Sequence, residues 1–301
     1  MSKDEKLLLK VDDLCMHFDV GGRRVKASEH VSFTINKGEI FGLVGESGSG
    51  KSTIGKCIIG LNRATSGSIT FHDRPIGSRP DPKIQMIFQD PMSSLNPKKQ
   101  VGEIIGEALD VLGLCKSRDE RTAAIKRIME RVGIPYAYAN RYPKSFSGGQ
   151  RQRIGIARAL VTEPELIIAD ECIAALDASV QAQVVNMLRE IRLETGTAFL
   201  FISHDLSMVR YLSDRIGVLH LGHMLEIGDA NEVFSNPVHP YTRSLLAAIP
   251  HTNPVLQKKN DRPYDYRTSG IDYALGSWHR VSDNHMVWCT DSEYEYWREE
   301  R

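Results

Sequence analysis

The first third of the chain carries hydrophobic patterns that predict β-strands around one helix. Strands are predicted in residues 7–20 and 31–45, where Val31, Phe33 and Ile35 alternate with polar neighbours and Lys37-Gly38 marks a turn. Residues 39–44 form a short, mainly apolar run before Gly45, which is typical of a central strand buried on both faces. The following segments predict a helix at residues 51–61 and strands at 67–72 and 84–88.

The middle of the chain changes to helical spacing. Apolar residues recur every three or four positions in residues 101–112 and 120–132, and no strand pattern interrupts them. This block, about residues 91–150, is predicted as a helical insert in an α/β protein. Alternating strands and helices follow it, which implies a largely parallel sheet covered on both faces. The predicted elements there are a helix at 148–161, a strand at 166–169, a helix at 180–193, a strand at 197–202 and a strand pair at 216–219 and 224–227.

The pattern changes again beyond about residue 235, where prolines and aromatic residues become frequent. A length of 301 residues suggests about two domains. We therefore predict a core domain over residues 1–235 and a C-terminal extension over residues 236–301. In the extension, Pro240 would open a helix at its first position and Pro250 would end it.

Composition and charge exclude several classes of protein. With 41% hydrophobic and 25% charged residues, the chain is neither collagen-like nor a low-complexity sequence. There are 38 basic residues (Lys and Arg) and 38 acidic residues (Asp and Glu). A nucleic-acid-binding protein usually has an excess of basic residues, so we expect no nucleic-acid partner. The five cysteines form no Cys-x-x-Cys pair, which argues against a disulfide framework and a zinc or iron–sulfur site. We expect a cytoplasmic chain, because no apolar run approaches a membrane span and the polar start lacks a signal-peptide core.

A glycine-rich loop between a predicted strand and a predicted helix is the strongest chemical signal. Residues 45–52 read Gly-Glu-Ser-Gly-Ser-Gly-Lys-Ser, the phosphate-binding pattern G-x-x-x-x-G-K-[ST]. The glycines let backbone N–H groups turn inward around a phosphate, and the following helix directs its positive end there. Lys51 adds a cation near the β- and γ-phosphates, and the Ser52 hydroxyl suits Mg²⁺. A glycine–serine loop without a ligand is the alternative, which the strand–loop–helix context disfavours.

An acidic pair at the end of a buried strand supplies a partner for this loop. Asp170 and Glu171 follow the apolar run 166–169, so their carboxylates lie at the sheet edge where open α/β folds bind ligands. Asp170 is expected to hold Mg²⁺, and Glu171 to orient the attacking water or accept its proton. Alone, such a pair is more often a solvated strand end, but the phosphate loop favours the functional interpretation.

A second anion-binding helix start precedes the acidic strand. Ser147 is placed to cap a helix, and Gly148 and Gly149 expose backbone N–H groups before Gln150. One γ-phosphate does not need two such helix ends from a single chain. Alone, the segment would be interpreted as a linker turn.

Together these segments resemble the ATP-binding cassette family. The resemblance implies a P-loop NTPase (RecA-like) α/β core with an N-terminal antiparallel β portion, an inserted helical subdomain and a C-terminal extension. It also implies a head-to-tail dimer, in which ATP lies between the phosphate loop of one chain and residues 147–150 of the other. The segments that carry the resemblance, in the family's order over residues 10–230, are residues 45–52, Gln89, residues 147–150, Asp170 with Glu171, Asp177 and His204.

The resemblance implies a role for each matching residue. Phe18 would stack on adenine, with a strand-edge aromatic as the alternative, and Gln89 would sense Mg²⁺ and the attacking water. His204 would contact the γ-phosphate and hold Glu171 in place. The implied catalytic residues are Lys51, Gln89, Glu171 and His204, and the implied Mg²⁺ ligands are Ser52, Gln89 and Asp170. The implied ATP contacts are Phe18, Gly45, Glu46, Ser47, Gly48, Ser49, Gly50, Lys51, Ser52, Thr53, Gln89 and Asp170, with Ser147, Gly148, Gly149, Gln150 and Asp177 acting on the other chain's ATP.

Two positions depart from the family's usual pattern. Cys172 stands where Pro is common, and Ala174 stands where a Ser hydroxyl commonly makes a hydrogen bond across the dimer. The residues implied in phosphate binding and hydrolysis all remain, so we predict a competent site.

The C-terminal extension narrows the resemblance. Residues 236–250 resemble the segment after the ATPase core in oligopeptide and dipeptide importers. These importers have two distinct ATPase subunits, and residues 95–97 and 101–105 look most like the subunit designated F. The resemblance implies an ATPase at the cytoplasmic face of the membrane that uses ATP and Mg²⁺ to energise peptide import. Some relatives bind an iron–sulfur cluster through tail cysteines, but only Cys289 lies in this tail, so we predict no cluster.

The same resemblance implies protein partners. These are a homologous second ATPase subunit in a heterodimer, two transmembrane permease subunits and, indirectly, an extracytoplasmic peptide-binding protein. An importer of nickel or glycosides stays open as an alternative, as does a non-transport ATP-binding cassette protein. Proteins of the latter class usually carry coiled-coil inserts or tandem cassettes, and no heptad run lies between Lys51 and Ser147.

Overall fold

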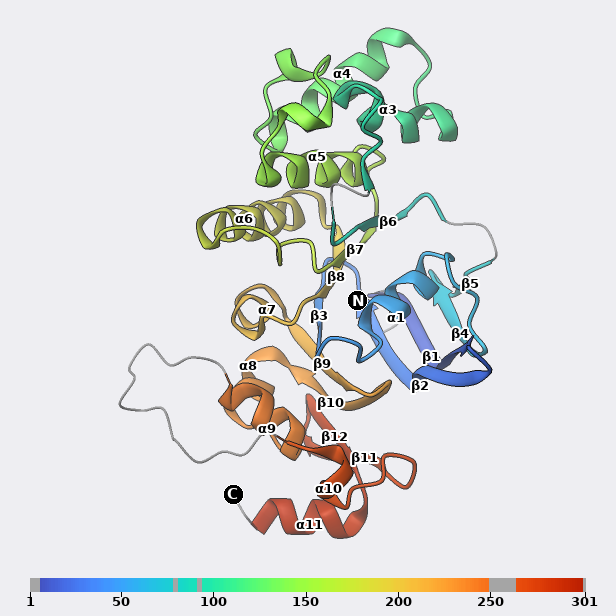
Figure 1. Cartoon of the computed structure of the whole chain (residues 1–301), viewed down its shortest axis with the longest axis vertical. Helices are drawn as coiled ribbons and strands as arrows, with labels where there is room; N and C mark the ends of the chain where they lie inside the picture. Colours follow the sequence, from blue (N-terminus) through green and yellow to red (C-terminus); the bar gives the residue numbers. More distant parts are fainter. Residues whose placement is uncertain (1–5, 78–80, 91–93, 249–263, 300–301) are drawn as a thin grey trace.

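The structure, a computed structural model, describes residues 6–77, 81–90, 94–248 and 264–299. They form an eight-stranded and a four-stranded sheet with helices around them. Figure 1 shows a helical block at one end of the molecule and the C-terminal elements at the other. The predicted α/β class, with a P-loop core, an antiparallel N-terminal part and a helical insert, is confirmed.

The larger sheet has the strand order β11-β12-β10-β9-β3-β8-β7-β6. All residues of β3 (Ile40–Val44), β7 (Leu166–Asp170) and β8 (Ala198–Ile202) are buried, as expected for parallel strands covered on both faces. Two further parallel strands, β6 (Ile84–Ile87) and β9 (Arg215–His220), flank this centre. The turns after these strands therefore meet at one edge, where the sequence places its chemistry.

The smaller sheet is antiparallel and has the order β2-β1-β4-β5. Its strands are β1 (Leu7–Val20), β2 (Arg23–Asn36), β4 (Ser66–Phe71) and β5 (Arg74–Pro75). The predicted turn at Lys37 and Gly38 is confirmed: Gly38, with φ at +67°, separates β2 from β3, so the predicted stretch 31–45 forms parts of two strands. The early part of β2 escaped prediction because residues 23–26 are exposed and all but Val25 are charged, so no apolar alternation marks them.

The helices cover the large sheet and form the block at its end. The central helices are α1 (Lys51–Ile58), α5 (Gly148–Leu160), α6 (Ala178–Thr195) and α7 (Leu206–Leu212). The block contains α3 (Val101–Leu112) and α4 (Arg118–Arg131). Ser117 caps the start of α4, because its side chain accepts a hydrogen bond from the Glu120 N–H. The predicted helices are found with small boundary changes. Helix α7 was not predicted, because its seven residues are too few to show a helical period.

The C-terminal extension continues the sheet of the core. After β10 (His223–Asp229) come α8 (Ala230–Ser235), α9 (Pro240–Ala247) and α10 (Tyr266–Ser269), then β11 (Ser277–Ser282), β12 (His285–Cys289) and α11 (Asp291–Glu299). β12 pairs antiparallel with β10, so the hairpin β11–β12 extends the eight-stranded sheet. No strand was predicted in the extension. Helix α9 begins at Pro240 as predicted, while its predicted end at Pro250 lies outside the described residues.

A buried carboxylate joins the extension to the core. Glu226 on β10 accepts from the backbone N–H groups of Val238 and His239, at 2.8 and 3.1 Å. Its Oε1 also lies 2.7 Å from Nε2 of His285 on β12, and both side chains are fully buried. These bonds satisfy a charge that would otherwise be costly to bury.

Within the described residues, no helix has both the length and the apolar character needed to cross a bilayer.

Candidate functional site

The phosphate loop joins β3 to α1, as the sequence predicted. Gly45, Gly48 and Gly50 adopt φ values of +150°, +82° and +107°, a region that favours glycine. A Cβ on Gly45 would lie 2.0 Å from the carbonyl oxygen of Leu219, so this position leaves no room for a side chain. The loop therefore takes its shape from residues without a Cβ, which leaves its backbone N–H groups accessible for an anion.

The Lys51 ammonium lies inside this loop. It donates to the carbonyl oxygens of Gly45 and Glu46, both at 2.8 Å, and to Oγ of Ser49 at 3.3 Å. Burial lowers the pKa of Lys51, and the carboxylates of Glu171, Asp170 and Glu46 partly oppose that effect. Phosphate oxygens in the loop would offer this buried cation anionic partners.

Ser52 and Asp170 meet across the gap between α1 and β7. The Ser52 hydroxyl donates to Oδ1 of Asp170 at 2.7 Å, although 118 residues separate them in sequence. Burial raises the pKa of Asp170, against the effect of the Ser52 hydrogen bond. A hydroxyl and a buried carboxylate are oxygen donors of the kind that Mg²⁺ prefers, so the residues present fit this ion.

Glu171 lies at the centre of a second set of polar contacts. Its Oε2 accepts from Nε2 of Gln89 at 2.8 Å, and its Oε1 lies 3.5 Å from Nδ1 of His204. The backbone of Glu171 adopts φ +44°, in the left-handed region that side chains other than glycine rarely occupy. Strain of this kind concentrates at functional sites, where the surrounding structure holds it in place.

The N-terminal sheet reaches the phosphate loop through β2. A Cβ on Gly50 would lie 2.0 Å from the carbonyl oxygen of Ala27, so this strand packs directly on the loop. In the β1–β2 ladder Phe18 pairs with Val25, close to this contact, and its side chain is partly buried. The predicted adenine-stacking residue is therefore on a strand beside the loop.

The predicted second anion-binding segment lies at the start of α5. Ser147 caps this helix, since its Oγ accepts from the Gln150 N–H at 3.3 Å and its own N–H donates to Oε1 of Gln150 at 3.0 Å. Gly148 is exposed, and a Cβ built on it would meet nothing within 4 Å. In the part of the chain that the structure describes, no hydrogen bond joins this segment to the phosphate loop. Figure 1 shows the start of α1 and helix α5 in separate regions of the molecule.

The remaining predicted residues follow the acidic strand. Asp177 is exposed at the start of α6 and makes no side-chain cap there. Cys172, one of the two departures from the family pattern, is 2% exposed, and burial raises the pKa of its thiol to about 12. The thiol is thus neutral and packed in the core, while the other departure, Ala174, is exposed.

Sequence reasoning missed two groups beside this site. Tyr241, from helix α9, accepts a hydrogen bond from the Glu46 N–H, and no signal in the sequence links residues so far apart. Cys15, His17 and Glu29 place potential metal-ligand atoms within 4.8 Å of one another. Because Glu29 already pairs with both His17 and Lys26, we interpret that group as an ion pair beside Phe18.

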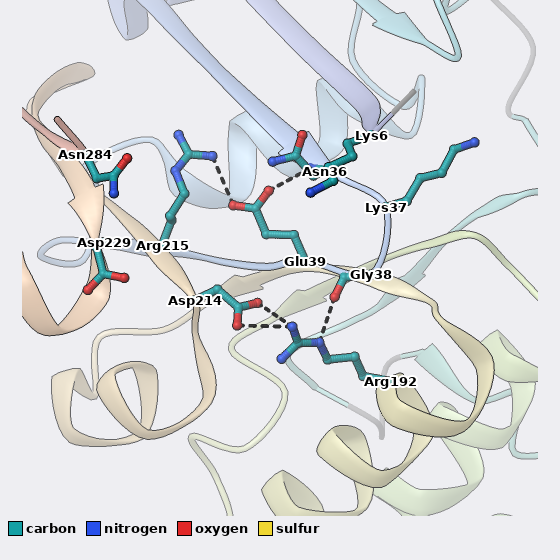
Figure 2. Close-up of a pocket in the computed structure, with 10 residues that line it drawn as sticks. All are labelled: Lys6, Asn36, Lys37, Gly38, Glu39, Arg192, Asp214, Arg215, Asp229 and Asn284. Carbon is teal, nitrogen blue, oxygen red and sulfur yellow. Dashed lines mark hydrogen bonds and ion pairs between the residues drawn. The ribbon is translucent and has the colours of Figure 1, made fainter. Parts of the chain in front are cut away.

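A charged pocket at another place in the fold is not this site. Figure 2 shows a pocket of about 520 Å³ at the amino ends of β3 and β9, opposite the phosphate loop. Arg215 lies 3.0 Å from Glu39, and Arg192 lies 2.8 Å from Asp214. Within each pair the two opposite charges neutralise each other, and the pairs hold the starts of the strands together.

Comparison with protein families gives two matches. Residues 28–174 match the family described as ABC transporter. Residues 225–269 match the family described as oligopeptide/dipeptide transporter, C-terminal region.

Individual proteins match over nearly the whole chain. The oligopeptide transport ATP-binding protein OppF of Bacillus subtilis (strain 168) is 48% identical over 298 residues, which cover 96% of this chain and 98% of that protein. The OppF protein of Streptococcus pyogenes serotype M1 is 47% identical over 303 residues, covering 97% and 98%. The oligopeptide transport ATP-binding protein AmiF of Streptococcus pneumoniae serotype 4 is 45% identical over 295 residues, covering 95% and 96%.

Solved structures share the fold of the core. CbiO1 from Clostridium perfringens, part of an ABC transporter complex, has a TM-score of 0.68 at 27% identity and covers 77% of this chain and 92% of its own. The ATP-binding cassette MJ0796, as a dimer in a post-hydrolysis state with ADP and Pi, has a TM-score of 0.68 at 26% identity, covering 74% and 99%.

Proposed function

The chain belongs to the ABC transporter family and, within it, to the oligopeptide transport ATP-binding proteins, and we propose that it hydrolyses ATP to energise the import of oligopeptides or dipeptides. One observation carries the catalytic part of this proposal. The phosphate loop, the Ser52–Asp170 pair and the Gln89–Glu171–His204 group gather at one edge of the sheet. A loop that binds phosphates thus lies beside carboxylates that can hold a metal ion and orient water.

The binding half of the mechanism uses the phosphate loop. Backbone N–H groups of residues 47–53 would surround the phosphates, while the N–H of Glu46 donates to Tyr241, and Lys51 would place its buried charge against the phosphate oxygens. Ser52, Asp170 and Gln89 would hold Mg²⁺, which supplies neutralisation of the charge on the β- and γ-phosphates. Phe18 would stack on the adenine ring.

The hydrolytic half uses Glu171. A water placed near its carboxylate would be oriented for attack on the γ-phosphorus and would transfer its proton to that carboxylate. Gln89 donates to one oxygen of Glu171 and His204 lies beside the other, so the pair fixes the direction of this base. His204, whose side chain is 56% exposed, is accessible to the γ-phosphate.

A second cassette would complete each site. The start of α5, where Ser147 and Gly148 are exposed, can bind phosphate through its backbone N–H groups and lies apart from this chain's own loop. Asp177 is exposed at the start of α6. We propose that they act on the ATP held by a homologous second ATPase subunit in a head-to-tail heterodimer. ATP binding would close this dimer and hydrolysis would reopen it.

A groove beside Gln89 is the proposed docking place for a permease subunit. It has a volume of about 680 Å³ and lies between the sheet, at Phe88, and helix α3. Val111 and Leu112, which line it, are 78% and 39% exposed, so the groove offers apolar surface to a partner. Because Gln89 follows Phe88 directly, movement of a segment in this groove would reach the hydrolytic group.

The division into an ATP-binding part (1–235, with a helical part at about 91–150) and an extension (236–301) forms part of this proposal. So does a place at the cytoplasmic face of the membrane, bound to two permease subunits. An extracytoplasmic binding protein would deliver the peptide, and this chain would act on it only through the complex.

A transport experiment tests the cargo. Cells that lack the gene should lose uptake of a labelled oligopeptide, and the parent gene should restore it while a Glu171→Gln variant should not. Labelled nickel and a labelled glycoside are measured in the same strains. Loss of nickel or glycoside uptake with intact peptide uptake would contradict the peptide cargo, and intact uptake of all substrates would contradict a role in import.

A further inference from the structure

The phosphate loop is in direct contact with the C-terminal extension through Tyr241. The backbone N–H of Glu46, the second residue of the loop, donates to the phenol oxygen of Tyr241 at 3.0 Å, across 195 residues of sequence. The Tyr241 side chain comes from helix α9 and is 1% exposed. A segment outside the predicted ATP-binding part therefore reaches the loop that holds the phosphates.

The position of this phenol is fixed from both the core and the extension. Its ring stacks on His220, at the end of β9, with centroids 4.0 Å apart and an interplanar angle of 22°. Its own backbone N–H donates to Nδ1 of His239 at 3.0 Å, and the His239 N–H donates to the buried Glu226. Tyr241 therefore has little freedom to move away from Glu46.

The turn between β9 and β10 holds the loop from a second direction. The Gly222 N–H donates to the carbonyl oxygen of Ser49 at 3.0 Å, and Gly45 packs so closely on Leu219 that a Cβ would lie 2.0 Å from its carbonyl oxygen. Ser49 and Glu46 are thus each tied to a different element. Between these ties lies Gly48, whose φ is +82°.

Anchoring matters because this loop is rich in glycine. A glycine-rich segment has many accessible conformations, and ordering it during binding reduces affinity for the ligand. A loop that is already held in place loses less entropy when phosphates bind. The anchor is a neutral hydroxyl at neutral pH, as any tyrosine is, and burial raises the pKa of the Tyr241 phenol further.

We propose that Tyr241 is a positioning residue for ATP, whose phenol oxygen holds Glu46 and with it the phosphate loop in the conformation that binds phosphates. This inference rests on the proposed function, because it assumes that the loop binds ATP. Among the described residues, Tyr241 has no hydrogen bond to Gln89, Glu171 or His204. It acts on ATP affinity and not on the chemical step.

The test is a Tyr241→Phe substitution in the full-length chain. This change keeps the ring on His220 and removes the acceptor for the Glu46 N–H. We expect the Kd and KM for ATP to rise about 3- to 10-fold and kcat to stay within about 2-fold, as for the loss of one hydrogen bond. Hydrogen exchange on the nucleotide-free protein should show faster exchange in residues 44–50 of the variant. If Tyr241 only stabilised the fold, the substitution would not confine faster exchange to this loop, and it would not raise KM while leaving kcat nearly unchanged.

Tyr264→Phe is the matched control. It removes a hydroxyl from the same aromatic cluster, but that hydroxyl contacts Ser269 and Tyr273 and not the phosphate loop. ATP affinity of this control should stay within about 2-fold of the parent. Equal ATP affinity and equal loop exchange in Tyr241→Phe and the parent would overturn this inference alone. A parent chain that does not bind ATP would overturn the proposed function and this role together.

Discussion

At the scale of single residues, the site depends on side chains held in unfavourable states. Glu171 occupies a left-handed backbone conformation at φ +44°, which costs about 1–2 kcal/mol for a residue other than glycine. Its N–H donates to the carbonyl oxygen of Ile202 at 2.9 Å, which holds the turn in place. Lys51 and Asp170 are buried ionisable groups whose pKa values are shifted toward their neutral forms. An oppositely charged ligand stabilises the charged form of such a buried group more than that of an exposed one.

The first prediction concerns the proposed base. Glu171→Gln keeps an acceptor near Gln89 but cannot take a proton, so we expect ATP turnover to fall by about 10²–10⁴-fold with ATP binding retained. Phosphate release measures turnover, and equilibrium binding of a fluorescent ATP analogue measures affinity. Glu163→Gln is the control, because Glu163 is exposed and pairs only with Arg127 among the salt bridges described. Turnover near the parent value would show that Glu171 is not the base.

The second prediction concerns the ammonium in the loop. Lys51→Ala removes a buried charge whose hydrogen bonds to phosphate would be charge-assisted, so we expect ATP affinity to fall about 10-fold or more. Lys37→Ala serves as control, because Lys37 is exposed at the opposite edge of the sheet (Figure 2). Unchanged affinity in Lys51→Ala would remove Lys51 from the phosphate site.

At the scale of elements, helix α9 and the end of β9 join the extension to the core through buried histidines. His239 caps α9 and is fully buried, and His220 lies between Tyr241 and Tyr273. Burial lowers the pKa of His220 to about 4 and that of His239 to about 3, from an ordinary 6.5. Both are therefore neutral in the folded chain near neutral pH.

The third prediction follows from these shifts. Below pH 6.5 the unfolded chain binds protons that the folded chain excludes, so stability is full above pH 6.5 and is lost as pH falls toward about 4 and then 3. At about pH 5 we expect the free energy of unfolding to fall by about 1–2 kcal/mol per histidine, measured by urea unfolding. His239→Asn keeps a capping acceptor that does not titrate, so it should weaken this pH dependence. An unchanged pH dependence in that variant would exclude His239 as a source.

At the scale of the whole molecule, the two segments that we propose to contact ATP lie apart. The phosphate loop and the start of α5 lie apart in Figure 1, and the second part is exposed. Only association with another cassette would bring parts of this kind together. The groove beside Gln89, with the exposed Val111 and Leu112 of α3, is the surface that we propose for a permease subunit.

The fourth prediction tests association. A side chain at Gly148 meets nothing within 4 Å, so Gly148→Asp should leave the fold and the ATP affinity of the single chain unchanged. Its carboxylate would face the phosphates of the other subunit, and we expect ATP-driven association to weaken about 10-fold or more by charge repulsion. Light scattering in the Glu171→Gln background, with and without a co-expressed homologous subunit, measures association. Gly148→Ala is the uncharged control, and equal association of all variants would contradict the two-chain site.

Local patterns in the sequence predicted much of the fold and the candidate site. Residues 45–52 and the apolar strand before Asp170 were identified because their signals depend on neighbours a few positions away. The predicted helices α3 and α5 are found for the same reason. The roles of Phe18, Ser147 and Asp177 toward ATP stay predictions, because they concern a ligand and a second chain.

Only the tertiary structure determined which distant segments are in contact. The pairing of β12 with β10, the bond from Glu46 to Tyr241 and the left-handed turn at Glu171 have no sequence signal, since each depends on how separate elements pack. By itself the sequence determined most elements of the core and the chemical groups that they carry, because hydrophobic periodicity and glycine placement act over short distances. Packing then determined which of those groups meet, and it placed the C-terminal extension against the phosphate loop.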